Sequence, residues 1–222
     1  QQGERGDRTA FRAFVEAVRE DHRICRFYGE KYDDRVESSS DGSALSRFET
    51  PSAAALLGDA VKKIGLQIMI AYRVMRFLRA AGLGLGAQFA SRTIRHAFSS
   101  DIHWEADLEP GIMIVHGFGL AISYAARARG GCILFQNVTL GYGPDRETGA
   151  KGAPLLERSV HVGIGATLYG PITVGEGTKI MAGCVLSRSV PPRSIVEAAA
   201  PQVTERAERA RARDPGERSK AS

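Results

Sequence analysis

Histidine is the residue type in this chain best suited to chemistry near neutral pH, because a neutral imidazole can take a proton from a reacting hydroxyl group. A carboxylate behind the ring would hold the correct tautomer and stabilise the charged form. A lone histidine, by contrast, is more often a structural residue satisfied by local hydrogen bonds. The five histidines are His22, His96, His103, His116 and His161. Residue type alone does not choose among them.

The cysteines indicate neither disulfide nor metal chemistry. Cys25, Cys132 and Cys184 form an odd set without C-x-x-C spacing. Sets of this kind are usually reduced and structural. We therefore expect three reduced, structural thiols, no disulfide framework and no zinc site.

Composition and charge favour a globular protein over a nucleic-acid or membrane protein. Hydrophobic residues make up 43% and charged residues 25% of the chain, and the net charge is +5. The basic tail is interleaved with acidic residues and has no aromatic side chain for base stacking. The longest uncharged apolar run of the helical region, 64–72, is too short to span a bilayer. The first ten residues lack the apolar core of a signal peptide, so we expect a cytoplasmic protein.

A repeat of six residues predicts the frame that would position these side chains. Apolar residues recur at every sixth position in two blocks separated by an interruption. Because about half of all positions are apolar in an average protein, chance would produce such a set in about one sequence in a thousand. The positions are Ile102, Leu108, Ile114, Leu120, Ala126, Cys132 and Val138, then Leu156, Val162, Leu168, Val174, Ile180 and Leu186.

A period of six fits neither an amphipathic helix nor an alternating strand, but it does fit a triangular coil. Each flat side of such a coil takes one hexapeptide, with an aliphatic side chain inward and a small residue at the tight corner. In the second block, the position four residues further on is also small or β-branched, as at Val160, Ala166 and Ile172. Stacked coils then bury a continuous core.

The chain divides into three expected zones. Residues 8–98 carry apolar stripes at helical spacing and predict an α-helical N-terminal region. Residues 99–196 predict the β-helix, interrupted at 142–155 by a Gly/Pro-rich loop that is expected to line a binding face. Residues 197–222 form an Arg-rich polar tail that we expect to be flexible.

Three segments of the repeat region resemble a known family. They read DIHWEADLEPGIMIVHGFGLAI, ILFQNVTLG and VGIGATLYGPITVGEGTKIMAGCVLSRSVPP, and they lie between Asp101 and Pro192. They are similar to the catalytic domain of bacterial and plant serine O-acetyltransferases, and AYRVMRFL resembles the last helices of that family's N-terminal domain. The resemblance implies a left-handed parallel β-helix preceded by helices, and an enzyme that transfers the acetyl group of acetyl-CoA to L-serine.

The resemblance also assigns catalytic roles. The family pairs an aspartate of the Asp-Ile-His segment with a histidine of the next coil, and the matching residues here are Asp101 and His116. It implies that His116 is the general base for direct transfer and that Asp101 orients its ring. His103, in the same segment, is expected near the acceptor in a supporting role.

The acceptor pocket departs from the family pattern. Val115 stands where the family has an aspartate, and Gly152 and Ala153 stand where it has arginine and histidine. Each lost charged hydrogen bond is worth about 1.5–3 kcal/mol. Lys151 or Arg146 would have to supply the missing positive charge. The acceptor is thus L-serine or another hydroxyl compound, such as a sugar, a polysaccharide or a biosynthetic intermediate, and a non-catalytic β-helix scaffold is the third interpretation.

For acetyl-CoA the resemblance implies a groove between neighbouring β-helices of a homotrimer, with no metal. The pantetheine arm is expected beside Gly141, Gly165, Ala166 and Ala182, because small residues let an extended chain approach the backbone. Lys179 is the candidate for the CoA phosphates. A helical region shorter than the family's favours a trimer over a dimer of trimers. The terminal sequence KAS lacks the family's isoleucine, so no sulfhydrylase complex is expected.

Overall fold

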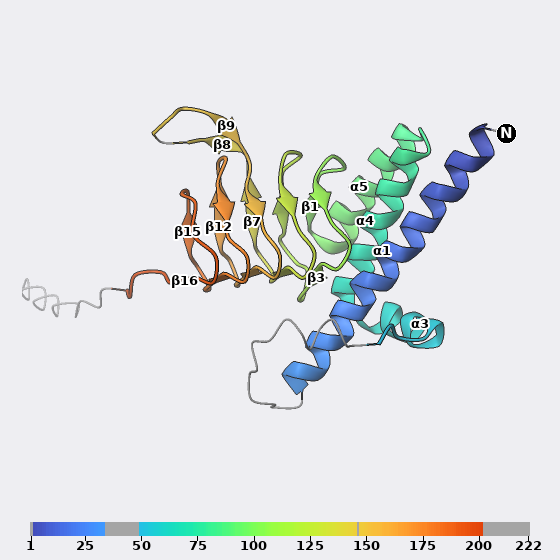
Figure 1. The fold of residues 1–222 in the computed structure, drawn as a ribbon, viewed down its shortest axis with the longest axis horizontal. Helices are drawn as coiled ribbons and strands as arrows, with labels where there is room; N and C mark the ends of the chain where they lie inside the picture. The colour runs from blue at the N-terminus through green and yellow to red at the C-terminus, as the bar shows by residue number, and fades with distance from the viewer. Residues whose placement is uncertain (1, 34–48, 146, 202–222) are drawn as a thin grey trace, which may run out of the picture.

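The computed structural model describes residues 2–33, 49–145 and 147–201. Within these ranges the helices come first and short strands follow (Figure 1). The helices are α1 (Gln2–Asp33), α3 (Ala53–Lys62), α4 (Ile64–Ala80) and α5 (Gly84–Phe98). Most of the predicted tail lies outside the described residues, so its flexibility stays a prediction.

The strands stack into three parallel sheets, which are visited in the order A, B, C on every turn of the chain. Sheet A contains β1 (Asp101–Ile102), β4 (Ala121–Ile122), β7 (Thr139–Gly141), β12 (Thr167–Tyr169) and β15 (Val185–Leu186). Sheet B contains β2 (Asp107–Leu108), β5 (Arg127–Ala128), β10 (Leu155–Leu156) and β13 (Thr173–Val174). Sheet C contains β3 (Met113–Ile114), β6 (Ile133–Leu134), β11 (His161–Val162), β14 (Lys179–Ile180) and β16 (Ile195–Val196). This is the left-handed parallel β-helix that we expected.

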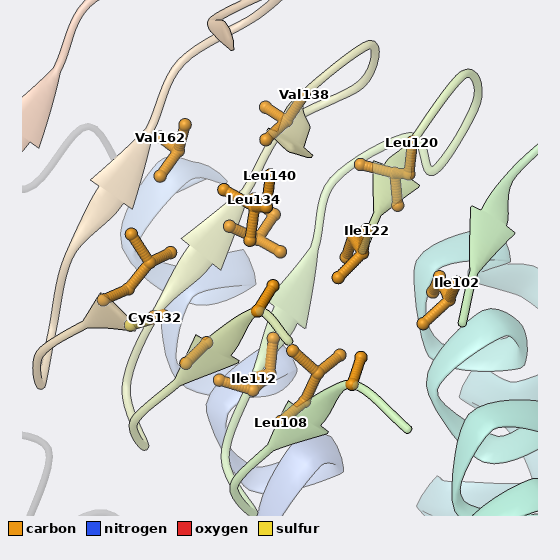
Figure 2. Close-up of a cluster of buried hydrophobic side chains, with 14 of the residues drawn as sticks. Ile102, Leu108, Ile112, Leu120, Ile122, Cys132, Leu134, Val138, Leu140 and Val162 are labelled. Carbon is orange, nitrogen blue, oxygen red and sulfur yellow. The ribbon is translucent and has the colours of Figure 1, made fainter. Parts of the chain in front are cut away.

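The positions of the six-residue repeat form the core of this β-helix. Every one of them is at most 4% exposed, and the labelled members in Figure 2 point into the coil. The buried polar residue in the same interior, Thr178, donates its hydroxyl to the carbonyl oxygen of Pro191 at 3.0 Å. Because a fully buried aliphatic side chain contributes about 1.5–3 kcal/mol relative to an exposed one, these columns hold the coils together.

The coils are not all of one length, and the exceptions mark two special segments. Paired strands are 18 residues apart between β4 and β7, where Ala121 pairs with Thr139, but 20 apart between β1 and β4, where Asp101 pairs with Ala121. The two extra residues lie between β3 and β4. Between β7 and β12 the separation is 28 residues. The ten extra residues form an antiparallel hairpin of β8 (Gly143–Pro144) and β9 (Lys151–Gly152), inside the segment 142–155 that we expected as a loop.

The two-residue insertion also changes which positions of the coil the six-residue repeat occupies. Leu108 and Ile114 lie within strands β2 and β3, whereas Leu120 and Ala126 directly precede strands β4 and β5. The apolar column therefore passes from strand positions to corner positions at the insertion. Both kinds of position face the interior, so the spacing of six continues without a visible break.

The helices cover the first coil of the β-helix (Figure 1). In the centre of this contact, the Tyr72 hydroxyl of α4 donates to the carbonyl oxygen of Ala106 at 2.8 Å and accepts the N–H of Leu108 at 3.0 Å. At the start of α4, a Cβ on Gly65 would collide with the carbonyl oxygen of Ile114. Only glycine permits this approach, which sets the beginning of α4 directly against β3.

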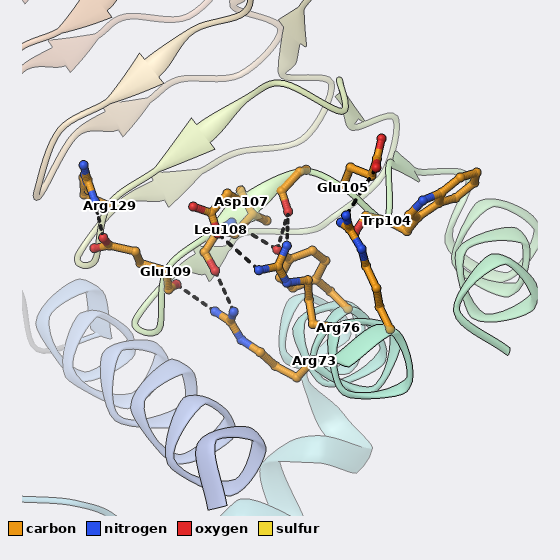
Figure 3. Close-up of polar contacts among 11 residues, drawn as sticks. Arg73, Arg76, Trp104, Glu105, Asp107, Leu108, Glu109 and Arg129 are labelled. Carbon is orange, nitrogen blue, oxygen red and sulfur yellow. Dashed lines mark hydrogen bonds and ion pairs between the residues drawn. The ribbon is translucent and has the colours of Figure 1, made fainter. Parts of the chain in front are cut away.

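A buried ion pair ties α1 and α4 to the corner before β3. Arg73 donates to both carboxylate oxygens of Asp21 at 2.7 and 3.0 Å, and both side chains are at most 6% exposed. The same carboxylate accepts the N–H groups of Gly111 and Ile112 at 2.8 and 3.0 Å. Arg73 also donates to the carbonyl oxygens of residues 108–109 at 2.6 and 2.7 Å (Figure 3). We call this cluster the Asp21 staple.

Candidate active site

His116 lies in the two-residue insertion between β3 and β4. Its backbone is left-handed, with a φ of +64°, which is uncommon for a residue other than glycine. Gly117 follows with a φ of +67°. The insertion makes this corner larger than the later ones, and the His116 side chain is exposed. The corner therefore offers the imidazole to solvent instead of packing it inside.

Serines after α5 hold this corner in place. The Ser100 hydroxyl donates to the carbonyl oxygen of Gly117 at 2.5 Å and accepts the N–H of Leu120 at 3.2 Å. The N–H of Gly119 donates to the carbonyl oxygen of Ser99 at 3.0 Å. His116 is thus carried by a hydrogen-bonded corner with fixed ends.

Asp101 begins β1 directly after Ser100, so its chain segment contacts the corner that carries His116. Its carboxylate, in a side chain 49% exposed, accepts a hydrogen bond from Arg95 of α5 at 2.7 Å. Among the described residues, Arg95 is the hydrogen-bond partner of this carboxylate. A bond between Asp101 and His116 therefore stays a prediction.

The corner of His116 belongs to an edge that runs along the β-helix between sheets C and A. We call its corners, residues 115–119, 135–137, 163–165 and 181–183, the histidine edge. Backbone hydrogen bonds of 2.7–3.0 Å join successive corners at Phe118–Asn137, Gln136–Gly165 and Ile164–Gly183. The structure thus brings Gly165 and Ala182, both predicted to contact acetyl-CoA, onto the same edge as His116.

The other residues predicted for acetyl-CoA are more scattered. Ala166 has no exposed surface, because its side chain belongs to the core. An approach of the pantetheine arm to its backbone stays a prediction. Gly141 is half-buried on β7, and Lys179 is exposed on β14, in register with His161. Gly165 has a φ of +67° and open space where a side chain would begin.

One polar group on the histidine edge was not singled out in the sequence. The Oε1 atom of Gln136 is buried and has no hydrogen-bond partner among the described residues. A buried acceptor without a donor costs about 1–3 kcal/mol. A ligand N–H group would remove this cost.

Two of the predicted acceptor residues, His103 and Lys151, lie on the other edge of sheet A. We call this edge, residues 103–105, 123–125, 142–145 and 147–154, the hairpin edge. His103 stacks on Trp104 with ring centroids 4.3 Å apart, and Tyr124 and Tyr142 extend the row at 5.8 and 5.2 Å. The tyrosines lie in different coils, and only the stacking of those coils brings their rings together.

The hairpin carries Lys151, which is exposed on β9 and pairs with Pro144 of β8. Its turn is ordered by Asp145, whose Oδ1 accepts the N–H and hydroxyl of Thr148 at 2.7 and 2.8 Å. These bonds hold the pKa of Asp145 below its ordinary value. Arg146 lies outside the described residues. Within one chain, Lys151 and His103 therefore lie on a different edge from His116.

Cys25, Cys132 and Cys184 are free thiols with buried side chains. Burial raises the pKa of Cys132 to about 12, so this thiol stays protonated at neutral pH and is not a nucleophile. In the parts of the chain that the structure describes, no three His, Cys, Asp or Glu side chains are grouped to hold a metal ion. No helix in these parts has both the length and the apolar character to cross a bilayer.

Comparison with known proteins gives no match to a family model, but it does give similar sequences. The chain is 35% identical to the serine acetyltransferase of Buchnera aphidicola over 129 residues, 58% of this chain and 49% of that protein. It is 37% identical to the Synechococcus elongatus enzyme over 127 residues, 57% and 51% of the two chains. It is 32% identical to serine acetyltransferase 2 of Arabidopsis thaliana over 172 residues, 77% and 53%. The chain spans about half the length of these relatives.

Solved structures show the same likeness. The serine acetyltransferase of Vibrio cholerae superposes with a TM-score of 0.64 at 29% identity, covering 86% of this chain and 66% of that one. Serine acetyltransferase 1 of Entamoeba histolytica, in complex with L-cysteine, gives 0.57 at 28% identity, covering 67% and 57%. A serine acetyltransferase in complex with CoA shares the fold, with a TM-score of 0.64 over 85% and 69% of the two chains. In sequence and in fold, this chain is similar to the serine O-acetyltransferases.

Proposed function

We propose that the chain is an acetyl-CoA-dependent O-acetyltransferase that acts on a hydroxyl acceptor. L-serine is the acceptor that the names of its relatives indicate. The observation that carries the proposal is the exposed His116 in the enlarged corner of a β-helix related to these enzymes. The left-handed backbone recurs at other corners, such as those of Asn137 and Ser159, so the enlarged corner and the exposed imidazole carry the proposal.

The proposed reaction is a direct transfer. His116 takes the proton of the acceptor hydroxyl group while the hydroxyl oxygen attacks the thioester carbon. This assistance is needed because an alcohol alone is too weak a nucleophile at neutral pH. A backbone N–H stabilises the oxyanion that forms. The C–S bond then breaks, and the proton passes from His116 to the leaving thiolate of CoA. Asp101, in the segment bonded to the same corner, orients the ring.

The histidine edge is the proposed path of the donor. Gly165 and Ala182 leave room for an extended pantetheine arm beside the backbone. The unpartnered Oε1 of Gln136 would accept an amide N–H of that arm. Lys179 remains the candidate for the CoA phosphates, as an exposed charge on the neighbouring sheet.

The proposed assembly is a homotrimer with sheet A toward the common axis. After Asp101 of β1, the outward residues in the same row of this sheet are small or apolar: Ala121, Thr139, Thr167 and Val185, the last 73% exposed. Sheet A is bounded by the histidine edge on one side and the hairpin edge on the other. In a closed threefold ring, the histidine edge of one chain therefore faces the hairpin edge of its neighbour, which would bring Lys151 and His103 of one chain toward His116 of the next.

The assembly predicts a particle of about 72 kDa, three times the 23.9 kDa chain, in light scattering at micromolar protein. Val185→Glu should shift this mass toward the monomer and lower activity in parallel, because three carboxylates would meet near the axis. A monomer with full activity would contradict both the trimer and the shared site.

The activity is tested by thiol release from acetyl-CoA with a panel of hydroxyl acceptors that begins with L-serine. We expect thiol release that depends on the acceptor and exceeds hydrolysis without it. O-acetylated product should appear in equal amount by mass spectrometry. If no hydroxyl compound of the panel accelerates thiol release, the chain is not an O-acetyltransferase for that panel. The result would favour the interpretation as a non-catalytic scaffold.

A further inference from the structure

A pocket of about 280 Å³ opens beside His116. Its walls come from three parts of the fold that are distant in sequence: α1, the junction of α3 and α4, and the corner after β3. The junction reaches this place because Gly65 lets α4 start against Ile114. The side chains that line it include Lys62, Lys63 and His116 among mostly apolar neighbours.

No carboxylate of the described residues lines this pocket. The nearest one in sequence, Asp59, is occupied: it accepts from His22 at 2.9 Å and lies 3.5 Å from Arg26 and 3.6 Å from Lys63. Lys63 is therefore partly neutralised. Lys62 is exposed at the pocket, and no partner is recorded for it among the described residues.

We infer that this pocket binds the acidic group of the acceptor, with Lys62 as its counter-charge and His116 as the base for its hydroxyl group. The inference rests on the proposed transferase function. According to this inference, the preferred acceptor is an alcohol that carries a negative charge. The pocket has no partner for an ammonium group, since Val115 lines it at the position where a carboxylate would be needed. Lys62 thus takes over the charge that Gly152 and Ala153 cannot supply.

The start of α4 adds to this preference for an anion. The residue before the helix, Lys63, makes no side-chain hydrogen bond to the first turn. The first N–H groups of a helix carry partial positive charge and favour a nearby anion. Together with the ammonium group of Lys62 they favour an anion here, and the carbonyl groups that end α3 at Lys62 offset part of this effect.

Binding is tested without turnover by NMR of the His116 imidazole, titrated with glycerate as a carboxylate probe and with glycerol 3-phosphate as a phosphate probe. We expect at least one of them to shift the His116 signals, while glycerol does not. Lys62→Met should raise the Kd about ten- to one hundredfold, the range for loss of a charged hydrogen bond. Lys62→Arg should keep most of the affinity. Which probe binds more tightly tells a carboxylate site from a phosphate site.

Arg158→Met is the matched control, because it removes one exposed positive charge from another corner of the β-helix. It should leave both titrations unchanged. The inference is overturned if neither anion shifts the His116 signals, or if Lys62→Met and Arg158→Met have the same Kd as the parent. Acetyl transfer that depends on His116 but not on Lys62 would leave the proposed function standing and remove only the anion site.

Discussion

Replacing His116 with alanine is expected to lower kcat for acetyl transfer by about two to four orders of magnitude, which is the usual contribution of a positioned general base. The KM for acetyl-CoA should change little, since the proposed donor contacts lie further along the histidine edge, at Gly165 and Ala182. The imidazole is exposed and has no structural partner to lose among the described residues, so the variant should fold normally. Thiol release at saturating donor and acceptor measures the effect.

Controls for this variant lie on the neighbouring elements. His96→Ala removes another exposed imidazole, in the last turn of α5, and should leave kcat unchanged. Asp101→Asn should lower kcat by a similar or smaller factor than His116→Ala, because the ring loses its orienting carboxylate. Arg95→Met frees the Asp101 carboxylate from its present partner and tests whether that ion pair restricts the carboxylate in orienting the His116 ring. Turnover near the parent level in His116→Ala would remove the histidine from the mechanism.

The core of the β-helix was predictable because its determinants are local and repeated. Each coil must bury the same inward positions, so the sequence shows them at a fixed spacing, from Ile102 to Leu186. The same regularity hid the insertion at His116. The interior accepts apolar residues at strand and corner positions alike, so Ile114 and Leu120 continue the spacing although they occupy different places in the coil.

The parts of the site that the sequence did not predict depend on contacts between distant segments. Lys62 lines the same pocket as His116 because Gly65 brings the start of α4 against β3. Tyr124 and Tyr142 form a row with His103 only after the coils have stacked. No spacing rule within the sequence expresses such contacts. Ala166 shows a related limit of the sequence: a small residue is suited both to an open groove and to a tight core, and only the structure shows that its side chain lies in the core.

The Asp21 staple predicts a large loss of stability. Asp21→Ala leaves the Arg73 guanidinium buried without its counter-charge and leaves the N–H groups of Gly111 and Ile112 unpaired. Breaking one side of a buried ion pair costs about 3–5 kcal/mol, a large part of the stability of an ordinary domain. Urea unfolding at fixed protein concentration, followed by circular dichroism, measures the change in free energy of unfolding.

The exposed ion pair of α1 gives the matched control. Arg12 and Glu16 are one helical turn apart, with side chains 81% and 62% exposed, and such exposed pairs contribute little to stability. Glu16→Ala should therefore shift the unfolding midpoint only slightly. Asp21→Leu combined with Arg73→Met should be less destabilised than Asp21→Ala, because no charge is then left alone in the interior. If Asp21→Ala costs no more than Glu16→Ala, the staple does not hold the helices to the first coil. The position of the pocket beside His116 would then have to rest on the Gly65 contact and the Tyr72 hydrogen bonds alone.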